Sequence, residues 1–106
     1  PSFLGLKQTS QSITADGSST TAVDVTSAIT EINATSATHT CAMADGSDGQ
    51  IKIIINTSTS GTNAVAITPA NFSNTSFTLN APGETAVCVF KNSKWYVIGG
   101  NGFTIA

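Results

Sequence analysis

The chain has 106 residues, enough for one domain that buries roughly two-thirds of the surface exposed in the unfolded state. Charged residues make up only 9% of it, against roughly 25% in ordinary soluble proteins, and there is no arginine. The net charge is −2, and the lysines are scattered at Lys7, Lys52, Lys91 and Lys94. This distribution argues against nucleic acid and against an anionic membrane surface as partners, because both need clustered cations.

The ends and the cysteines give further expectations about location and cofactors. No apolar run approaches the roughly 18 residues of a membrane span, and residues 1–7 lack the features of a signal peptide, so we expect synthesis in the cytoplasm. Cys41 and Cys88 lie in alternating apolar stretches, which predicts two buried, reduced thiols, with a disulfide as the alternative. A metal site would have to combine His39 with Cys41 and further ligands at short spacing, so no cofactor is expected.

In chain order, short apolar stretches alternate with turn formers. Residues 1–11 are expected to form an N-terminal arm, and residues 12–106 a single β-domain. Alternation continues over 21–32, where Ser27–Ile32 would fit one helical turn. Pro82-Gly83 predicts a type II turn with Gly83 at positive φ, and Asn92-Ser93 a two-residue hairpin loop. The other expected strands are 12–15, 38–44, 51–56, 64–68, 77–79, 85–91, 94–98 and 103–105.

The remaining connections are a turn at 16–19, a glycine turn at 45–49, a hairpin loop at 57–63 and a loop at 70–75 in which Phe72 would plug the core. About eight or nine short strands with this turn spacing predict an all-β fold with little helix. The expected architecture is an antiparallel β-sandwich or a jelly-roll-like barrel.

Three strands are apolar on both sides. In the strand 51–56, Ile51, Ile53 and Ile55 share one face, while Ile54 lies on the other beside Lys52. The strands 85–91 and 94–98 are apolar on both faces as well, which is too much surface for a small two-layer fold to cover. This pattern predicts an oligomer interface, and cover by the arm and the Phe72 loop is the alternative. The interface residues expected are Ile54, Val87, Val89, Tyr96 and Ile98.

Chemical sites are weakly indicated. Asp45 and Asp48 would fit either Ca²⁺ binding or ordinary turn hydrogen bonds, and their spacing matches no established calcium loop. His39 has no nucleophile-and-acid pairing, and no G-x-S-x-G, paired-carboxylate or P-loop pattern is present, so an enzyme is not expected. Trp95 and Tyr96 would fit sugar stacking or packing, and only one of them can serve a given surface.

Several turn and core motifs carry a family resemblance. They are Ala44-Asp45-Gly46, Gly49-Gln50-Ile51-Lys52, Ile67 to Phe72, Pro82 to Thr85, and Lys94 to Val97 followed by Gly102. Over residues 12–106 the chain resembles a small β-module of virion proteins in tailed bacteriophages, marine and cyanobacterial phages especially. The family occurs as modules of larger fibre or tail proteins and as small stand-alone virion proteins.

The resemblance, with the short chain and its arm, implies a capsid decoration (cement) protein at the outer capsid surface of the virion. It would bind there as a homotrimer and stabilise the shell. The partner would be the major capsid protein, contacted through the arm residues Phe3, Leu4, Leu6 and Lys7. The alternative is a trimeric tail-fibre or receptor-binding module whose loops at 58–63 and 71–76 contact a host-surface glycan.

Overall fold

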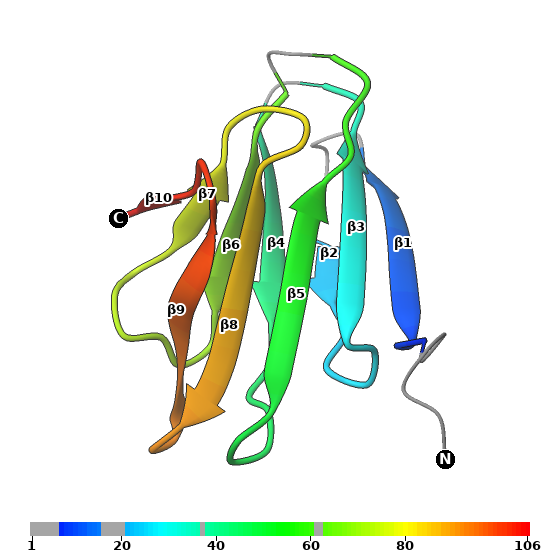
Figure 1. Cartoon of the computed structure of the whole chain (residues 1–106). Helices are drawn as coiled ribbons and strands as arrows, with labels where there is room; N and C mark the ends of the chain where they lie inside the picture. Colours follow the sequence, from blue (N-terminus) through cyan, green and yellow to red (C-terminus); the bar gives the residue numbers. More distant parts are fainter. Residues whose placement is uncertain (1–6, 16–20, 37, 61–62) are drawn as a thin grey trace.

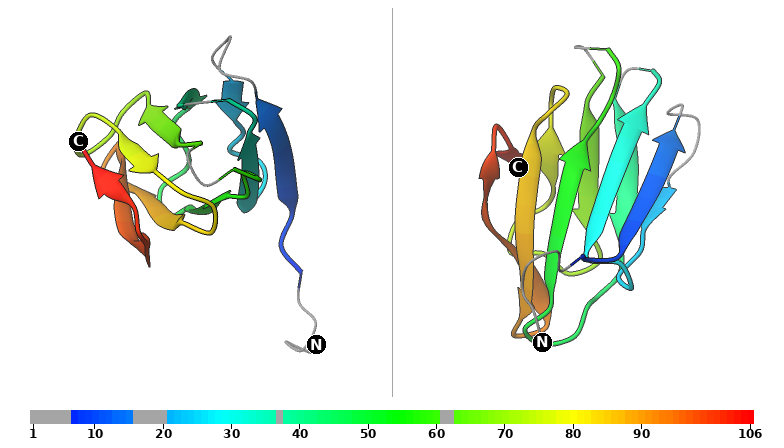
Figure 2. Two further views of the ribbon diagram at one scale, coloured as in Figure 1. Left: turned by 90° about the horizontal axis from the view of Figure 1, so that it is seen from above. Right: turned by 45° about the vertical axis from the view of Figure 1, so that its right-hand side comes forward.

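The protein is an all-β sandwich in the computed structural model, which describes residues 7–15, 21–36, 38–60 and 63–106. Two five-stranded sheets pack face to face with the core between them (Figures 1 and 2). The described residues form ten strands and no helix: β1 (Ser10–Ala15), β2 (Thr21–Val23), β3 (Ile29–Ala34), β4 (His39–Met43), β5 (Ile51–Asn56), β6 (Val65–Pro69), β7 (Phe77–Leu79), β8 (Thr85–Lys91), β9 (Lys94–Asn101) and β10 (Thr104–Ile105).

The sheets are mixed, whereas the sequence predicted antiparallel pairing throughout. Sheet A has the order β1-β3-β5-β8-β9 and sheet B the order β10-β7-β6-β4-β2. From β1 to β6 the chain alternates between the sheets, so every second strand returns to the same sheet in the same direction and pairs in parallel. The pairs formed by β7 to β10 are antiparallel and complete both sheets. The first six strands thus stack as three turns of a flattened coil (Figure 1).

Other expectations about local structure had mixed outcomes. The helical turn expected at Ser27–Ile32 is wrong: Ile29–Ala34 is a strand, because it pairs with β1 on one side and β5 on the other. The hairpin expected at 57–63 is also wrong, since β5 and β6 belong to different sheets. The turn expected at 16–19 lies outside the described residues, and β1 begins within the expected arm, at Ser10.

Two turns are confirmed by the backbone. Asn92 and Ser93 both have positive φ, 54° and 66°, as the type I′ loop of a two-residue hairpin requires. Gly83 has φ 88°, and the amide of Glu84 donates to the carbonyl of Ala81 across this turn (3.2 Å).

The core lies between the sheets and is closed by aromatic side chains at the β9 side. Phe90 and Trp95 meet edge to face, with ring centroids 5.2 Å apart, and Trp95 Nε1 donates to the Ala44 carbonyl (2.9 Å). Phe72 plugs the core as predicted, 5.5 Å from the ring of Phe77. The largest fully buried apolar side chains are Trp95, Phe77, Ile32, Met43, Ile54, Ile67 and Leu79.

Candidate assembly surface

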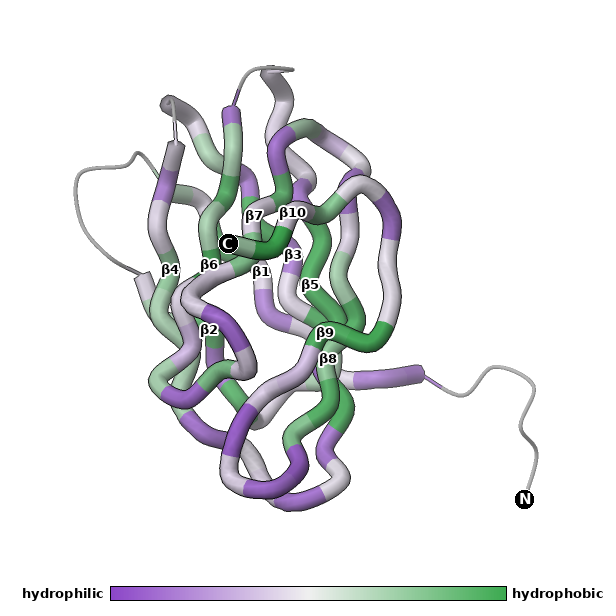
Figure 3. The backbone as a smooth tube through the Cα atoms, turned by 90° about the vertical axis from the view of Figure 1, so that its left-hand side faces the viewer, coloured by the Kyte–Doolittle hydropathy of each residue, from purple (hydrophilic) through white to green (hydrophobic). Residues whose placement is uncertain are grey.

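The outer face of sheet A is apolar over four neighbouring strands. One row across the sheet joins Ile51, Val89 and Tyr96, and the next joins Ile29, Ile53 and Val87. Ile55 and Ile98 extend the same surface. Figure 3 shows hydrophobic residues, of the inner and the outer face together, along β5, β8 and β9. We call this set the apolar face: Ile29, Ile51, Ile53, Ile55, Val87, Val89, Tyr96 and Ile98.

The apolar face is open to solvent in this chain. Ile98 is 59% exposed and Ile51 46%, and the other six side chains are partly exposed. Polar groups border it: Glu31 on β3, Lys91 and Lys94 at the β8–β9 turn, and hydroxyl side chains along β1. A contiguous apolar patch with a polar rim is typical of an interaction site.

The structure places four of the five predicted interface residues on this face and the fifth inside the domain. Val87, Val89, Tyr96 and Ile98 lie together on its β8–β9 side. Ile54 is 0% exposed and belongs to the core, so its assignment to the outer surface is wrong. The outward residues of β5 are instead its other three isoleucines.

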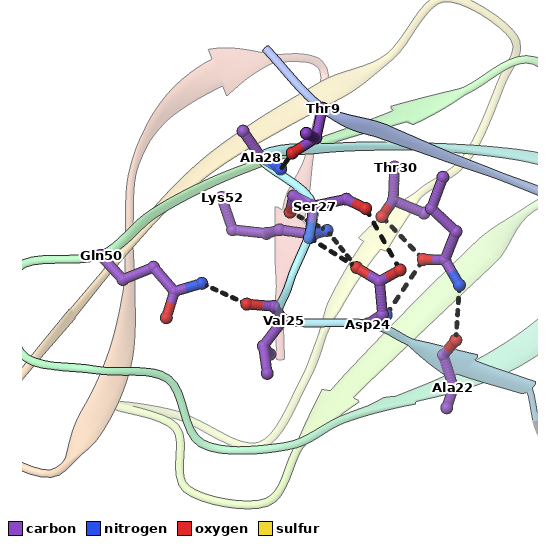
Figure 4. Close-up of polar contacts among 10 residues, drawn as sticks. Thr9, Ala22, Asp24, Val25, Ser27, Ala28, Thr30, Gln50 and Lys52 are labelled. Carbon is purple, nitrogen blue, oxygen red and sulfur yellow. Dashed lines mark hydrogen bonds and ion pairs between the residues drawn. The ribbon is translucent and has the colours of Figure 1, made fainter.

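Lys52 explains this inversion, because its buried ammonium group has partners on the partly exposed loop between β2 and β3. The side chain is 0% exposed, and its Nζ donates to the carbonyl of Ser27 (2.6 Å) and lies 3.5 Å from Asp24 Oδ1. Asp24 also accepts bonds from the Ser27 amide (2.9 Å) and hydroxyl (3.3 Å). These contacts fasten the loop between β2 and β3 to β5 beneath the sheet (Figure 4).

Gln11 and Gln50 extend this polar cluster. Gln11 Oε1 accepts bonds from the amide of Asp24 (3.0 Å) and the hydroxyl of buried Thr30 (2.9 Å). Gln50 Nε2 donates to the Val25 carbonyl (2.6 Å). Most of the cluster's polar atoms are therefore occupied by hydrogen bonds and ion pairs within the domain (Figure 4).

Burial shifts the protonation of this pair in ways that fit a structural role. It lowers the pKa of Lys52 from 10.5, although the nearby Asp24 carboxylate opposes the shift. Burial would raise the pKa of Asp24, but the hydrogen bonds from Ser27 and the charge of Lys52 outweigh it and hold this pKa below 3.8.

The cysteines and the histidine are also built into the interior. Cys41 and Cys88 are free and buried, as predicted, and burial raises their pKa values to about 11 and about 12. Both thiols therefore stay protonated at neutral pH and are poor nucleophiles. His39 is 1% exposed, and its Nε2 lies 3.0 Å from Thr21 Oγ1.

The two aspartates of the glycine turn take part in other contacts. Both carboxylate oxygens of Asp45 accept a hydrogen bond from Asn71 Nδ2 (2.9 Å each). Asp48 forms an ion pair with Lys91 (2.8 Å). Among the described residues, no three His, Cys, Asp or Glu side chains are grouped so as to hold a metal ion. Asp45 and Asp48 are therefore engaged by residues distant in sequence, and the hydrogen bonds given for them above are not the turn bonds expected from the sequence.

The outer face of sheet B differs from that of sheet A because its side chains are small. Ala22, Ala42 and Thr68 are exposed there on neighbouring strands. Together with Ala44 and Ala70 they line a hollow of about 520 Å³, bordered by the Asp24 loop. Its polar groups are few, and the carboxylate at its edge already has partners on Ser27 and Lys52.

The features expected for glycan contact are not brought together. Residues 58–60 and 63 precede β6 and residues 71–76 follow it, so the two expected loops lie at opposite ends of that strand, and residues 61–62 lie outside the described residues. Ser58 and Asn63 are buried: the Ala34 amide donates to Ser58 Oγ (2.9 Å), and Asn63 Nδ2 donates to the Ala34 carbonyl (2.6 Å). Trp95 is fully buried, so of the two aromatic candidates only Tyr96 is on the surface.

Of the predicted arm contacts, Lys7 is exposed, whereas Phe3, Leu4 and Leu6 lie outside the described residues. The part of the chain that the structure describes has no helix long and apolar enough to cross a membrane. The Phe72 loop packs on the core beside Phe77 and so does not cover the apolar face.

Neither a protein-family model nor a curated protein matches this chain.

Proposed function

We propose that this protein is a structural component of a virus particle, a capsid decoration protein that binds the outer shell as a trimer and stabilises it. The observation that carries the proposal is the apolar face, a large hydrophobic surface on a domain whose polar clusters serve its own fold. The resemblance of residues 12–106 to a bacteriophage virion module gives that surface a context. A β-sandwich with few charged residues and an exposed apolar face is suited to a permanent assembly.

A cyclic trimer would use the apolar face in two halves. Each copy in a threefold ring meets two neighbours through different patches. The β3–β5 half of one face, with Ile29 and Ile53, would contact the β8–β9 half of the next, with Val89 and Ile98. Ile98 and Ile51, the most exposed of the set, would then lose the most surface to solvent.

Shell binding would stabilise the particle by mass action. A protein that binds the assembled shell, and not its separated subunits, adds its binding free energy to the stability of the assembly. The major capsid protein is the proposed partner, contacted by the N-terminal arm with Phe3, Leu4, Leu6 and Lys7. After synthesis in the host cytoplasm, the protein would be located on the outer capsid surface.

The test is made on purified particles that contain the protein. A decoration protein is expected in a copy number proportional to that of the shell protein, with density at the threefold positions of the capsid by electron microscopy. A copy number that matches the tail fibres, or density confined to the tail, would overturn the proposal in favour of the fibre module. A chain lacking residues 1–7 should bind stripped shells more weakly, and unchanged binding would contradict the role given to the arm.

A further inference from the structure

Within the described part of the chain, the outer edge of β1 carries backbone groups that pair with no other strand. β1 ends sheet A and pairs only with β3 among the described strands. The amides of Ile29 and Thr35 donate to the carbonyls of Thr9 (3.1 Å) and Ala15 (2.7 Å), so the odd-numbered residues of this strand face β3. Successive residues direct their N–H and C=O groups to opposite sides of a strand. Those of Ser10, Ser12 and Thr14 therefore point away from the sheet.

Among the described residues, this edge shows none of the usual protection against pairing. Natural edge strands are commonly shortened, bulged, or interrupted by charged residues or proline. β1 has six residues, Ser-Gln-Ser-Ile-Thr-Ala, without charge or proline, and no irregularity interrupts its pairing with β3. Ser10, Ser12 and Thr14 are all exposed. An open edge of this kind is a template for another strand.

The other three sheet edges in the described part of the chain are blunted. On β9, Trp95 exchanges backbone bonds with Asn71 and Ser73 (3.0 Å each), and a register shift interrupts its pairing with β8. On β2, the amide of the Gln11 side chain occupies the edge: Nε2 donates to Ala22 O (3.3 Å) and Oε1 accepts from Asp24 N (3.0 Å). β10 is only two residues long.

We propose that β1 pairs antiparallel with β1 of a second copy, about a twofold axis at Ser12. This register alone sets all three outward residues of one copy against outward residues of the other. Ser12 then faces its own counterpart, and Ser10 faces Thr14 of the second copy. Serine and threonine are favourable cross-strand neighbours, and no two directly opposed residues are charged. The nearest carboxylate is that of Glu31 on β3, which accepts a hydrogen bond from the Ser12 hydroxyl (3.1 Å). Twofold contacts are the commonest between identical chains.

The pairing would join two copies of sheet A into one continuous sheet with about six new backbone hydrogen bonds. It uses groups on β1, whereas the apolar face spans β3 to β9, so one copy can form both contacts. The pairing does not rest on the proposed function. Because each backbone bond adds little net stability in water, the contact is expected to be weak and concentration-dependent.

Engineered cysteines test both the contact and its register. Opposed Cα atoms in a hydrogen-bonded antiparallel pair lie about 5.5 Å apart, within the range of about 4.4 to 6.8 Å that a disulfide spans. Ser12→Cys should therefore form a covalent dimer under mild oxidation. Thr14→Cys is the matched control, because in this register the two substituted positions are about 14 Å apart. The native Cys41 and Cys88 are buried in both variants.

Non-reducing electrophoresis of folded protein gives the rates of dimer formation. We expect Ser12→Cys to cross-link at least about tenfold faster than Thr14→Cys, and an equimolar mixture of Ser10→Cys and Thr14→Cys to cross-link faster than either variant alone. Equal rates for Ser12→Cys and Thr14→Cys, or no gain in the mixture, would overturn the pairing. Ser12→Lys and Ser12→Glu should each weaken self-association in sedimentation experiments, and mixing them should restore it. Failure of that rescue would exclude the twofold register.

Discussion

The apolar face makes a quantitative prediction about self-association. Replacing Ile51 and Ile98 by serine removes the two most exposed apolar side chains of that face, which are 46% and 59% exposed. Full burial of an isoleucine contributes about 1.5 to 3 kcal/mol. Scaled by these exposures, the double variant loses about 2 to 3 kcal/mol of association free energy per copy. This corresponds to about 30- to 150-fold in each contact.

Ile105→Ser is the matched control. Ile105 on β10 is 38% exposed but belongs to sheet B, so it is chemically equivalent and lies off the apolar face. Sedimentation velocity over a range of concentrations measures association. Urea unfolding checks that each variant keeps its fold, since exposed substitutions change stability by about 0.5 kcal/mol or less. A wild-type monomer at every concentration, or an equal loss in Ile105→Ser, would refute the reasoning.

Three further predictions concern the fold. Gly100→Ala should destabilise the domain by about 2 to 5 kcal/mol in urea unfolding, because the φ of Gly100 is +139° and a Cβ there would clash with the backbone of Thr85. Gly99→Ala is the control and should be nearly neutral, because a Cβ at Gly99 meets nothing within 4 Å. Asn56→Leu should lower the free energy of unfolding by about 2 to 4 kcal/mol in the same assay. The buried Asn56 side chain forms hydrogen bonds with the backbone of Ser58, Asn63 and Leu79 (2.9 to 3.1 Å), and these buried groups would lose their partner. A loss below about 1 kcal/mol in either case would contradict the packing described. Lys52→Met should remove one component of the pH dependence of stability. Between the lowered pKa of Lys52 in the folded protein and 10.5, the unfolded chain binds more protons than the folded one. The free energy of unfolding of the wild type, relative to that of the variant, should therefore rise with pH across that window. A difference between the two proteins that is flat or falls with pH would contradict the charged burial of Lys52.

Local chemistry accounts for the features that could be predicted from sequence. Asn92-Ser93 and Gly83 occupy positive-φ positions that few other residues tolerate, so their turns could be located without tertiary information. Period-two alternation located most strands and identified β5, β8 and β9 as apolar on both sides. These signals depend on one residue and its immediate neighbours, so they can be recognised without knowledge of the fold.

Strand direction could not be predicted in the same way. A strand has the same alternation whether its neighbour is parallel or antiparallel, and the segments between strands here are short enough to resemble hairpin loops. The structure uses the segments after β1 to β5 to cross from one sheet to the other. Pairs such as Ile13 with Ile32 and Cys41 with Ile67 stack in register only because of these crossings. That information lies in contacts between distant segments.

The inversion of β5 shows how one buried charge changes the expected surface. Alternation separates the strand into two faces but does not say which is inside, and a lysine ordinarily marks the outer one. Here the Ser27 carbonyl and Asp24 supply partners for Lys52 beneath the sheet, so its whole face, with Ile54 and Asn56, can be buried. Three isoleucines are then exposed in place of one. The apolar face is therefore continuous from β3 to β9, and a loop contact inside the domain determines the surface that we propose for assembly.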